Sequence, residues 1–217
     1  MTPQHHLSDD MIESYADGSL SEGWSIAVAS HMALCPQCRA RLGALEAIGG
    51  AVLSTVATAP IEDDAWAAMR ARISAVPREA GAPVRVEPSA ALLPRPLRDY
   101  VGSDVEGIRW RSLGRGASQL RLRTGDRETQ VRLLRIPAGK PVPEHSHGGR
   151  ELTLVLSGAF RDGDAVFGRG DIEDADSTLT HQPIATEDAD CICLAVTDAP
   201  LRFTSWIVRL VQPVLGI

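Results

Sequence analysis

Three side chains with metal-binding chemistry follow one another closely around residue 35. His31 and Cys35 are one helical turn apart, and Cys38 is the second thiol of a Cys-Pro-Gln-Cys sequence. Zn²⁺ prefers thiolate and imidazole ligands, and a structural zinc binds four of them in a tetrahedron. His5 or His6 can provide the fourth. The pattern predicts a structural or redox-sensitive zinc site; a thioredoxin-like redox pair is disfavoured because no βαβ pattern surrounds the cysteines.

A second set of candidate ligands lies in the C-terminal half. His145 and His147 alternate along an extended segment, so both imidazoles face the same side. Glu151 follows a Gly-Gly-Arg turn and can return a carboxylate to that side, and His181 can join them from a neighbouring strand. Three histidines with one glutamate suit Zn, Mn, Fe or Ni. The sequence predicts a second metal site without selecting its metal.

The remaining two cysteines, Cys191 and Cys193, also alternate on a predicted strand. Their Cα atoms would lie about 6.7 Å apart, at the outer limit for a disulfide. Two interpretations stay open. The thiols either pack as small apolar side chains that face one side of a β structure, or act as oxidant-sensitive groups.

Helices are expected to position the first set of ligands. Apolar residues recur at helical spacing over the first ~75 residues. The first helix begins after Ser8 and ends at Gly18, and the second begins after Ser21 and carries His31. The third has Pro36 in its first turn and ends at Gly49-Gly50. A fourth begins near residues 62–64 and carries Trp66, Met69 and Ile73.

Short strands are expected to position the second set. Five prolines between residues 76 and 96 predict a semi-extended linker. Short apolar runs separated by turns follow and predict an antiparallel β-barrel or sandwich. The fold class is therefore a multidomain α plus β protein, with a four-helix zinc-binding domain at residues 1–77, a Pro-rich linker at 78–98 and a metal-binding β domain at 99–217. The expected strands are residues 108–110, 119–122, 131–136, 152–156, 165–167 and 191–196.

Charge and hydropathy limit the partners. The chain has a formal net charge of −6 and a pI near 5.5. Residues 1–85 contain six Arg against ten Asp and Glu, or 6 − 10 = −4. This balance disfavours direct nucleic-acid binding and favours a basic protein partner. Neither a secretory signal nor a membrane span is visible, so we expect a cytoplasmic protein without a membrane partner.

The first constellation resembles a known family. Residues 6–20, HLSDDMIESYADGSL, followed by His31-x3-Cys35-x2-Cys38, are similar to the zinc-binding anti-sigma domain. The resemblance implies that His6, His31, Cys35 and Cys38 are the zinc ligands. It also implies three helices around the metal and a fourth helix, which together bind an extracytoplasmic-function sigma factor one-to-one.

The second constellation is similar to the first metal motif of the cupins, Gly139-x5-His145-x-His147-x3-Glu151-x6-Gly158. The second cupin motif matches loosely, since Gly163 and Gly170 are present but His181 comes late. With residues 190–203 and 211–217, the whole chain resembles the two-domain zinc anti-sigma factors of the singlet-oxygen response. That family implies an inhibitor whose cupin domain senses singlet oxygen or organic peroxide and releases the sigma factor.

Parts of the sequence are compatible with two other functions. A three-His, one-Glu cupin can act as a metal-dependent dioxygenase or isomerase on a small molecule, but that leaves the helical half unexplained. A DNA-binding zinc repressor conflicts with the acidic N-terminal half. We therefore expect a regulatory protein and not an enzyme.

Overall fold

The computed structural model describes residues 2–76 and 91–205. The chain divides into two compact units: one joins Met1–Glu46 with Ala91–Ile217, and the other is Ala47–Ala90. Most of the expected linker, residues 77–90, lies outside the described residues. No helix in the described part of the chain is long and apolar enough to cross a membrane.

Three helices precede residue 54, and their starts follow the sequence signals. They are α1 (Asp9–Ala16), α2 (Glu22–Leu34) and α3 (Pro36–Leu53). Ser8 and Ser21 occupy the N-cap positions of α1 and α2, and Gly18 follows α1 with a φ of +76°, which a residue with a side chain rarely adopts. The expected end of α3 at Gly49-Gly50 is wrong. Glycine lowers helix stability without forcing termination, and the helix continues to Leu53.

Two further helices differ in how well the sequence predicts them. In the second compact unit, α4 (Ala65–Ala75) has the expected position and no buried residue. Two helices were not predicted: α5 (Arg95–Val101), which overlaps the end of the expected linker, and the 3-10 helix η1 (Val105–Gly107). The expected count of four is therefore one short of the five α-helices among the described residues. Pro94 and Pro96 mark the start of α5 instead of preventing a helix, because proline is tolerated in the first turn.

Between residues 111 and 205, every strand pairing is antiparallel, and the strands form three sheets. The largest has the order β1-β2-β3-β11-β5-β8, and the smaller two are β10-β6-β7 and β12-β4-β9. The predicted strand at residues 108–110 is wrong, because the first strand begins at Arg111. The strands are β1 (Arg111–Gly114), β2 (Ala117–Leu122), β3 (Gln130–Ile136), β4 (His145–Ser146), β5 (Glu151–Ser157), β6 (Ala159–Asp162), β7 (Ala165–Gly168), β8 (Ile172–Ala175), β9 (Thr180–His181), β10 (Ile184–Ala185), β11 (Cys191–Thr197) and β12 (Arg202–Phe203).

The central strands β5 and β11 are buried on both faces, which explains their continuous apolar sequences. On β5, Leu152 and Leu154 belong to a core shared with the helices, whereas Glu151 and Thr153 line a cavity on the opposite face. The same alternation on β11 separates Ile192, Leu194 and Val196 from Cys191 and Cys193. Because side chains alternate along a strand, each of these strands carries a helix-facing row and a cavity-facing row.

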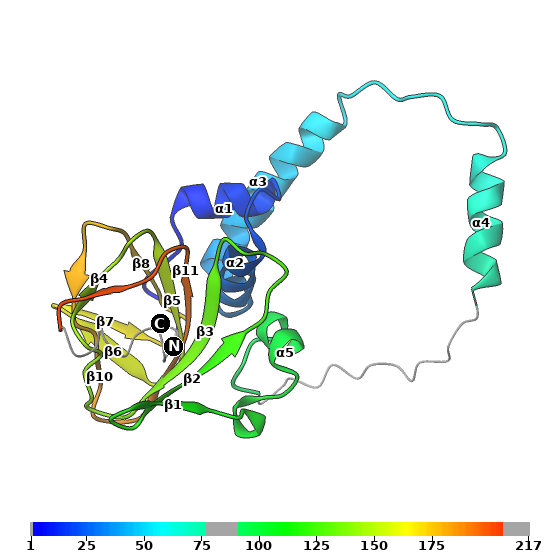
Figure 1. Cartoon of the computed structure of the whole chain (residues 1–217). Helices are drawn as coiled ribbons and strands as arrows, with labels where there is room; N and C mark the ends of the chain where they lie inside the picture. The colour runs from blue at the N-terminus through cyan, green and yellow to red at the C-terminus, as the bar shows by residue number, and fades with distance from the viewer. Residues whose placement is uncertain (1, 77–90, 206–217) are drawn as a thin grey trace. The chain divides into compact units, whose positions relative to one another are not determined.

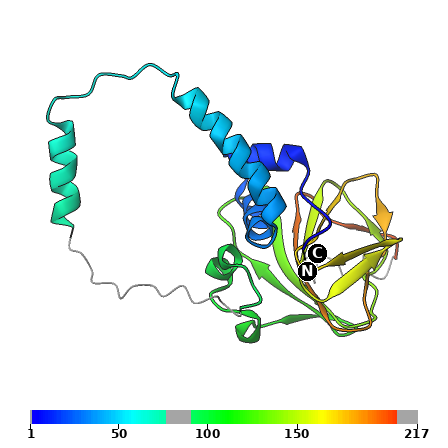
Figure 2. The same cartoon turned by 180° about the vertical axis from the view of Figure 1, so that it is seen from behind.

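Helix α2 packs against β5 and β11 on the helix-facing side of the large sheet, with α5 beside it (Figure 1). Figure 2 shows the same layer from behind. At the start of α2, the Gly23 N–H donates to Asp126 at 2.8 Å, and a Cβ at this glycine would lie 2.0 Å from Thr129 Oγ1. The Tyr100 hydroxyl donates to Glu22 at 2.8 Å. Residues 1–46 therefore share one core with the β domain, and a division into modules at residue 77 stays a prediction about function.

The N-terminal segment, residues 4–10, runs along β8, an edge strand of the large sheet. Asp171 Oδ1 accepts hydrogen bonds from the backbone N–H groups of Gln4 and His5, and the Ile172 N–H donates to the His5 carbonyl at 3.4 Å. The Ser8 hydroxyl caps no helix N–H and instead donates to Asp174 at 3.1 Å. Backbone and side-chain hydrogen bonds thus attach this segment to the β domain.

Candidate metal centres

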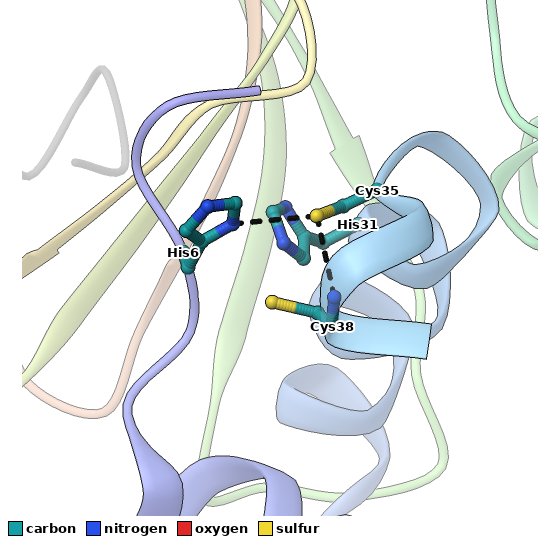
Figure 3. Close-up of side chains that lie close together, drawn as sticks. All are labelled: His6, His31, Cys35 and Cys38. Atoms are coloured by element: carbon teal, nitrogen blue, oxygen red, sulfur yellow. Dashed lines mark hydrogen bonds between the residues drawn. The ribbon is translucent and has the colours of Figure 1, made fainter. Parts of the chain in front are cut away.

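Helix ends bring the four predicted N-terminal ligands together. His31 lies on the last turn of α2, Cys35 at the α2–α3 junction and Cys38 in the first turn of α3, while His6 comes from the segment along β8. Figure 3 shows the four side chains pointing toward one another. Their ligand atoms all lie within 4.8 Å of one another. His6 Nδ1 is 3.3 Å from Cys35 Sγ, close to the separation of about 3.3–3.8 Å between neighbouring ligands in a tetrahedron with 2.0–2.3 Å bonds.

The donor chemistry of this cluster fits a metal ion. The His31 side chain is fully buried, and neither of its ring nitrogens has a hydrogen-bond partner among the described residues. Such an orphaned pair of polar atoms is costly unless a cation binds one of them. Burial lowers the pKa of His31 to about 4, against a smaller opposing effect of the Gly170 backbone. The imidazole is therefore neutral near pH ~7, the form in which histidine binds metals.

The surroundings of the two thiols, Cys35 and Cys38, also suit metal ligands. Burial raises the pKa of the Cys38 thiol, so a nearby cation is needed to stabilise its thiolate. The Cys38 N–H donates to Cys35 Sγ at 3.4 Å, and Arg41 Nη1 approaches Cys38 Sγ at 3.9 Å. Both groups direct positive charge at the sulfurs.

The choice between His5 and His6 follows from their surroundings. The His5 ring lies on the Phe167 ring, with centroids 4.2 Å apart, and its Nδ1 is 3.7 Å from Asp171. Only His6 is in the cluster with Cys35. The structure therefore places the favoured histidine, and not the alternative, at the candidate zinc site.

A second cluster forms between the small sheet β12-β4-β9 and the cavity face of the large sheet. His145 and His181 are paired residues on β4 and β9, and His147 follows β4. Their Nε2 atoms converge: His181 Nε2 is 3.0 Å from His147 Nε2 and 3.2 Å from His145 Nε2. Ligands at right angles around one ion at about 2.1 Å are separated by about 3.0 Å. The three imidazoles thus have the spacing of ligands to a single cation.

Hydrogen bonds fix two of these rings in the tautomer that a metal needs. His145 Nδ1 donates to the Pro143 carbonyl, and His181 Nδ1 donates to Asp162, each at 2.8 Å. A proton held on Nδ1 leaves the Nε2 lone pair free. Burial, the largest effect, lowers the pKa of His145 and favours its neutral form. Both rings are therefore prepared to ligate through Nε2.

The predicted fourth ligand, Glu151, lies beside this cluster but outside it. Its Oε2 is 3.6 Å from His147 Nδ1, on the side of the ring away from the converging nitrogens, and its Oε1 accepts a bond from Thr153. Burial is the largest effect and favours the neutral acid, but the contact with His147 and the other polar groups around the carboxylate together lower the pKa of Glu151. The structure brings the three histidines together and leaves the carboxylate against the His147 ring.

Two carboxylates beside His181 had no signal in the sequence. Asp162 ends β6 and Glu173 lies on β8, and both approach His181 Nδ1, at 2.8 and 3.8 Å. Burial and the charge of Asp162 raise the pKa of Glu173 to about 8. Asp162 begins an Asp-Gly-Asp turn, a common turn sequence, and Glu173 is distant in sequence from every predicted ligand. Only the strand pairing brings them to the site.

A cavity of about 60 Å³ adjoins the histidines, and most of its lining is apolar. Cys191 and Cys193 both line it, together with His145, Glu151 and Glu173. The thiols are nearly inaccessible, at 2% and 5% exposure. A hydrogen bond with Cys191, followed by burial, raises the pKa of Cys193 well above its usual range. Cys191 and Cys193 face the same side of β11, which agrees both with apolar packing and with an oxidant-sensitive pair. A redox role therefore stays a prediction.

The fold and its two clusters define the class: a cupin-like β domain with a buried trihistidine cluster, joined to helices that carry a His/Cys cluster. The family described as the ChrR cupin-like domain matches residues 99–200. The anti-sigma-E factor ChrR of Cereibacter sphaeroides is 49% identical over 217 residues, which is the whole of both chains. The crystal structure of Rhodobacter sphaeroides SigE in complex with the anti-sigma ChrR matches with a TM-score of 0.79 and 46% identity, covering 91% of this chain and all of that one.

The chain belongs to the ChrR family of anti-sigma factors. The resemblance to this family of anti-sigma factors is thereby confirmed along the whole chain.

Proposed function

We propose that the chain binds an extracytoplasmic-function sigma factor one-to-one in the cytoplasm and keeps it inactive, without catalysing a reaction. The full-length similarity to ChrR, whose structure was solved together with SigE, carries this proposal. A His/Cys cluster at the helix ends gives a second argument, because Zn²⁺ bound there would hold α1, α2 and α3 in one arrangement.

The surface on α4 suits a partner protein. Trp66, Met69 and Ile73 follow one another at helical spacing and are 64%, 45% and 61% exposed. An apolar stripe of this kind is usually covered by a partner in solution. Leu7 and Met11, by contrast, are buried at 2% and 4% exposure and belong to the core. We therefore propose that α4 carries a partner-binding surface.

The β domain is proposed to sense the signal, singlet oxygen or organic peroxide, which leads to release of the sigma factor. His145, His147 and His181 would hold Zn²⁺ or another divalent metal, with Glu151 as the fourth ligand after a change of its rotamer. Cys191 and Cys193 line the adjoining cavity and are the candidate oxidant-sensitive groups.

Co-purification of the tagged full chain with the sigma factor of its source bacterium tests the proposal. We expect a one-to-one complex that contains zinc and does not support transcription from a sigma-dependent promoter. Trp66→Ala should weaken the complex by about 2 kcal/mol, as expected for an interface tryptophan, and Ala71→Ser on the opposite side of α4 should not. A zinc-loaded chain that captures no sigma factor would refute the proposal.

A further inference from the structure

Arg150 lies between the two chain segments that carry the candidate ligands of the β domain. It follows His147 by three residues and directly precedes Glu151. The turn around it is fixed by Asp198, whose Oδ1 accepts the Arg150 N–H at 2.8 Å and would lie 1.9 Å from a Cβ at Gly149. The Arg150 backbone is therefore held to the end of β11, and only Gly148 and Gly149 separate it from His147.

The side chain of Arg150 leaves the metal loop and contacts α1. Its guanidinium donates to Asp174 on β8 and, at 2.6 Å, to Asp10 in the first turn of α1. It also donates at 2.8 Å to the hydroxyl of Ser8, the N-cap residue of α1, which in turn donates to Asp174. The planar guanidinium of Arg150 thus joins the metal loop, β8 and the start of α1. Arginine can donate several hydrogen bonds in fixed directions in this way, and lysine cannot.

The contacted segment leads directly to the zinc cluster. Ser8 is two residues after His6, and Asp10 is four residues after it. Arg150 is only 29% exposed, and its hydrogen bond is the largest effect that lowers the pKa of Asp10 to about 2. The pair is thus ionised at every physiological pH, and protonation does not control it.

We propose that Arg150 is a latch that couples ligation at His145, His147 and His181 to the position of α1 and the His6 segment. With the metal loop ordered, Arg150 holds Ser8 and Asp10; with the loop released, the start of α1 loses these contacts. The latch deepens the proposed function, because it gives the β domain a physical route to the helices that organise the anti-sigma domain.

Hydrogen exchange of the free, full-length chain in Zn²⁺-containing buffer tests the latch. His145→Ala removes one imidazole from the β-domain cluster and leaves the His6 cluster intact, and metal analysis must show that one zinc is retained. We expect His145→Ala and Arg150→Ala each to speed exchange in residues 9–16 about threefold, and the double variant to show no further increase, as coupled sites behave. Arg150→Lys should give a partial effect.

Arg135→Ala is the matched control. It also removes an arginine that is paired with an aspartate, Asp190, on the surface of the β domain, but that pair has no contact with α1. It should leave exchange in α1 unchanged. Two results would overturn the latch. One is an exchange rate in α1 that Arg150→Ala leaves unchanged. The other is a double variant in which the increases in exchange rate from His145→Ala and Arg150→Ala add in full.

The two proposals can fail separately. If α1 responds but no sigma factor is captured, the latch stands and the assigned partner is wrong. If a sigma factor is captured but α1 does not respond, the proposed function stands and the latch is wrong.

Discussion

Asp162 orients one of the candidate metal ligands of the β domain. It accepts the Nδ1 proton of His181 and so directs the Nε2 lone pair toward the other two histidines. Replacing such a partner typically weakens metal affinity about 10- to 100-fold. We predict this loss for Asp162→Ala, measured by competition with a chromophoric chelator, and a smaller loss for Asp162→Asn, whose amide oxygen still accepts the proton.

Asp164 provides the control for this experiment, because it is an exposed carboxylate in the same turn. Asp164→Ala should bind metal as the wild type does. Equal affinities for Asp162→Ala and Asp164→Ala would show that His181 needs no carboxylate to orient it.

The Asp10–Arg150 pair makes a prediction about pH. Because the pKa of Asp10 falls from 3.8 to about 2 on folding, its contribution to stability is complete above 3.8 and is lost as the pH drops through about 2. The stability difference between wild type and Asp10→Asn, from denaturant unfolding, should therefore be constant from about pH 7 to pH 5. No stability difference at any pH in this range would mean that Asp10 is not paired in solution.

Residue types and spacing located His31, Cys35 and Cys38 in one cluster and His145 and His147 in the other, because these ligands are close together in the sequence. His5 and His6 could not be separated in this way. Their roles depend on Phe167 and Asp171, which are more than 160 residues away in sequence. Asp162, Glu173 and Arg150 were not predicted for the same reason, since their partners become neighbours only through strand pairing.

At the scale of elements, the docking of α2 depends on a glycine. A methyl group at Gly23 would meet Thr129 and Val131 at 2.0–2.8 Å. Gly23→Ala should lower the free energy of unfolding by about 1–3 kcal/mol through overpacking. Gly43 in α3 has nothing within 4 Å of the corresponding position, so Gly43→Ala should raise stability by about 0.5–1 kcal/mol.

Thermal unfolding of the two glycine variants provides the measurement. If Gly23→Ala does not lower stability, α2 does not pack against the loop containing Thr129 in the way described.

Helices and strands were predicted well where a periodic or continuous apolar pattern extended over many residues. The helical periodicity identified α1 to α4, and the continuous apolar runs identified β3, β5 and β11. The prolines near residue 95 were interpreted as a linker, although proline also suits a first helical turn, as in α5. The two-residue strands β4, β9, β10 and β12 have too few residues to show a period, and pairing partners alone define them.

At the scale of the whole molecule, the shared core predicts joint unfolding. Buried residues of α1 and α2, including Ile12, Ile26 and Val28, belong to the same apolar cluster as Leu154 and Leu194 of the large sheet. We expect α1, α2 and the β domain to unfold in one cooperative transition. Hydrogen exchange in increasing denaturant should give residues 9–34 and 191–197 the same global opening free energy.

Addition of a chelator should lower the midpoint of that single transition, because metal binding stabilises the folded state alone. Two separated transitions, with the helices opening first, would show that the shared core contributes little.

The helix-facing and cavity-facing rows of side chains on β5 and β11 also limit how β domains can be exchanged between related proteins. A β domain that evolved as an independent sensor has no surface matched to α2, and helices taken without their sheet expose Ile26 and Val28. An exchange of sensor domains between relatives would therefore succeed only if the helix-facing rows, α5 and the Gly23 contact are transferred together. In this architecture, substitutions inside the cavity leave the helix-facing rows intact, whereas replacement of the whole β domain does not.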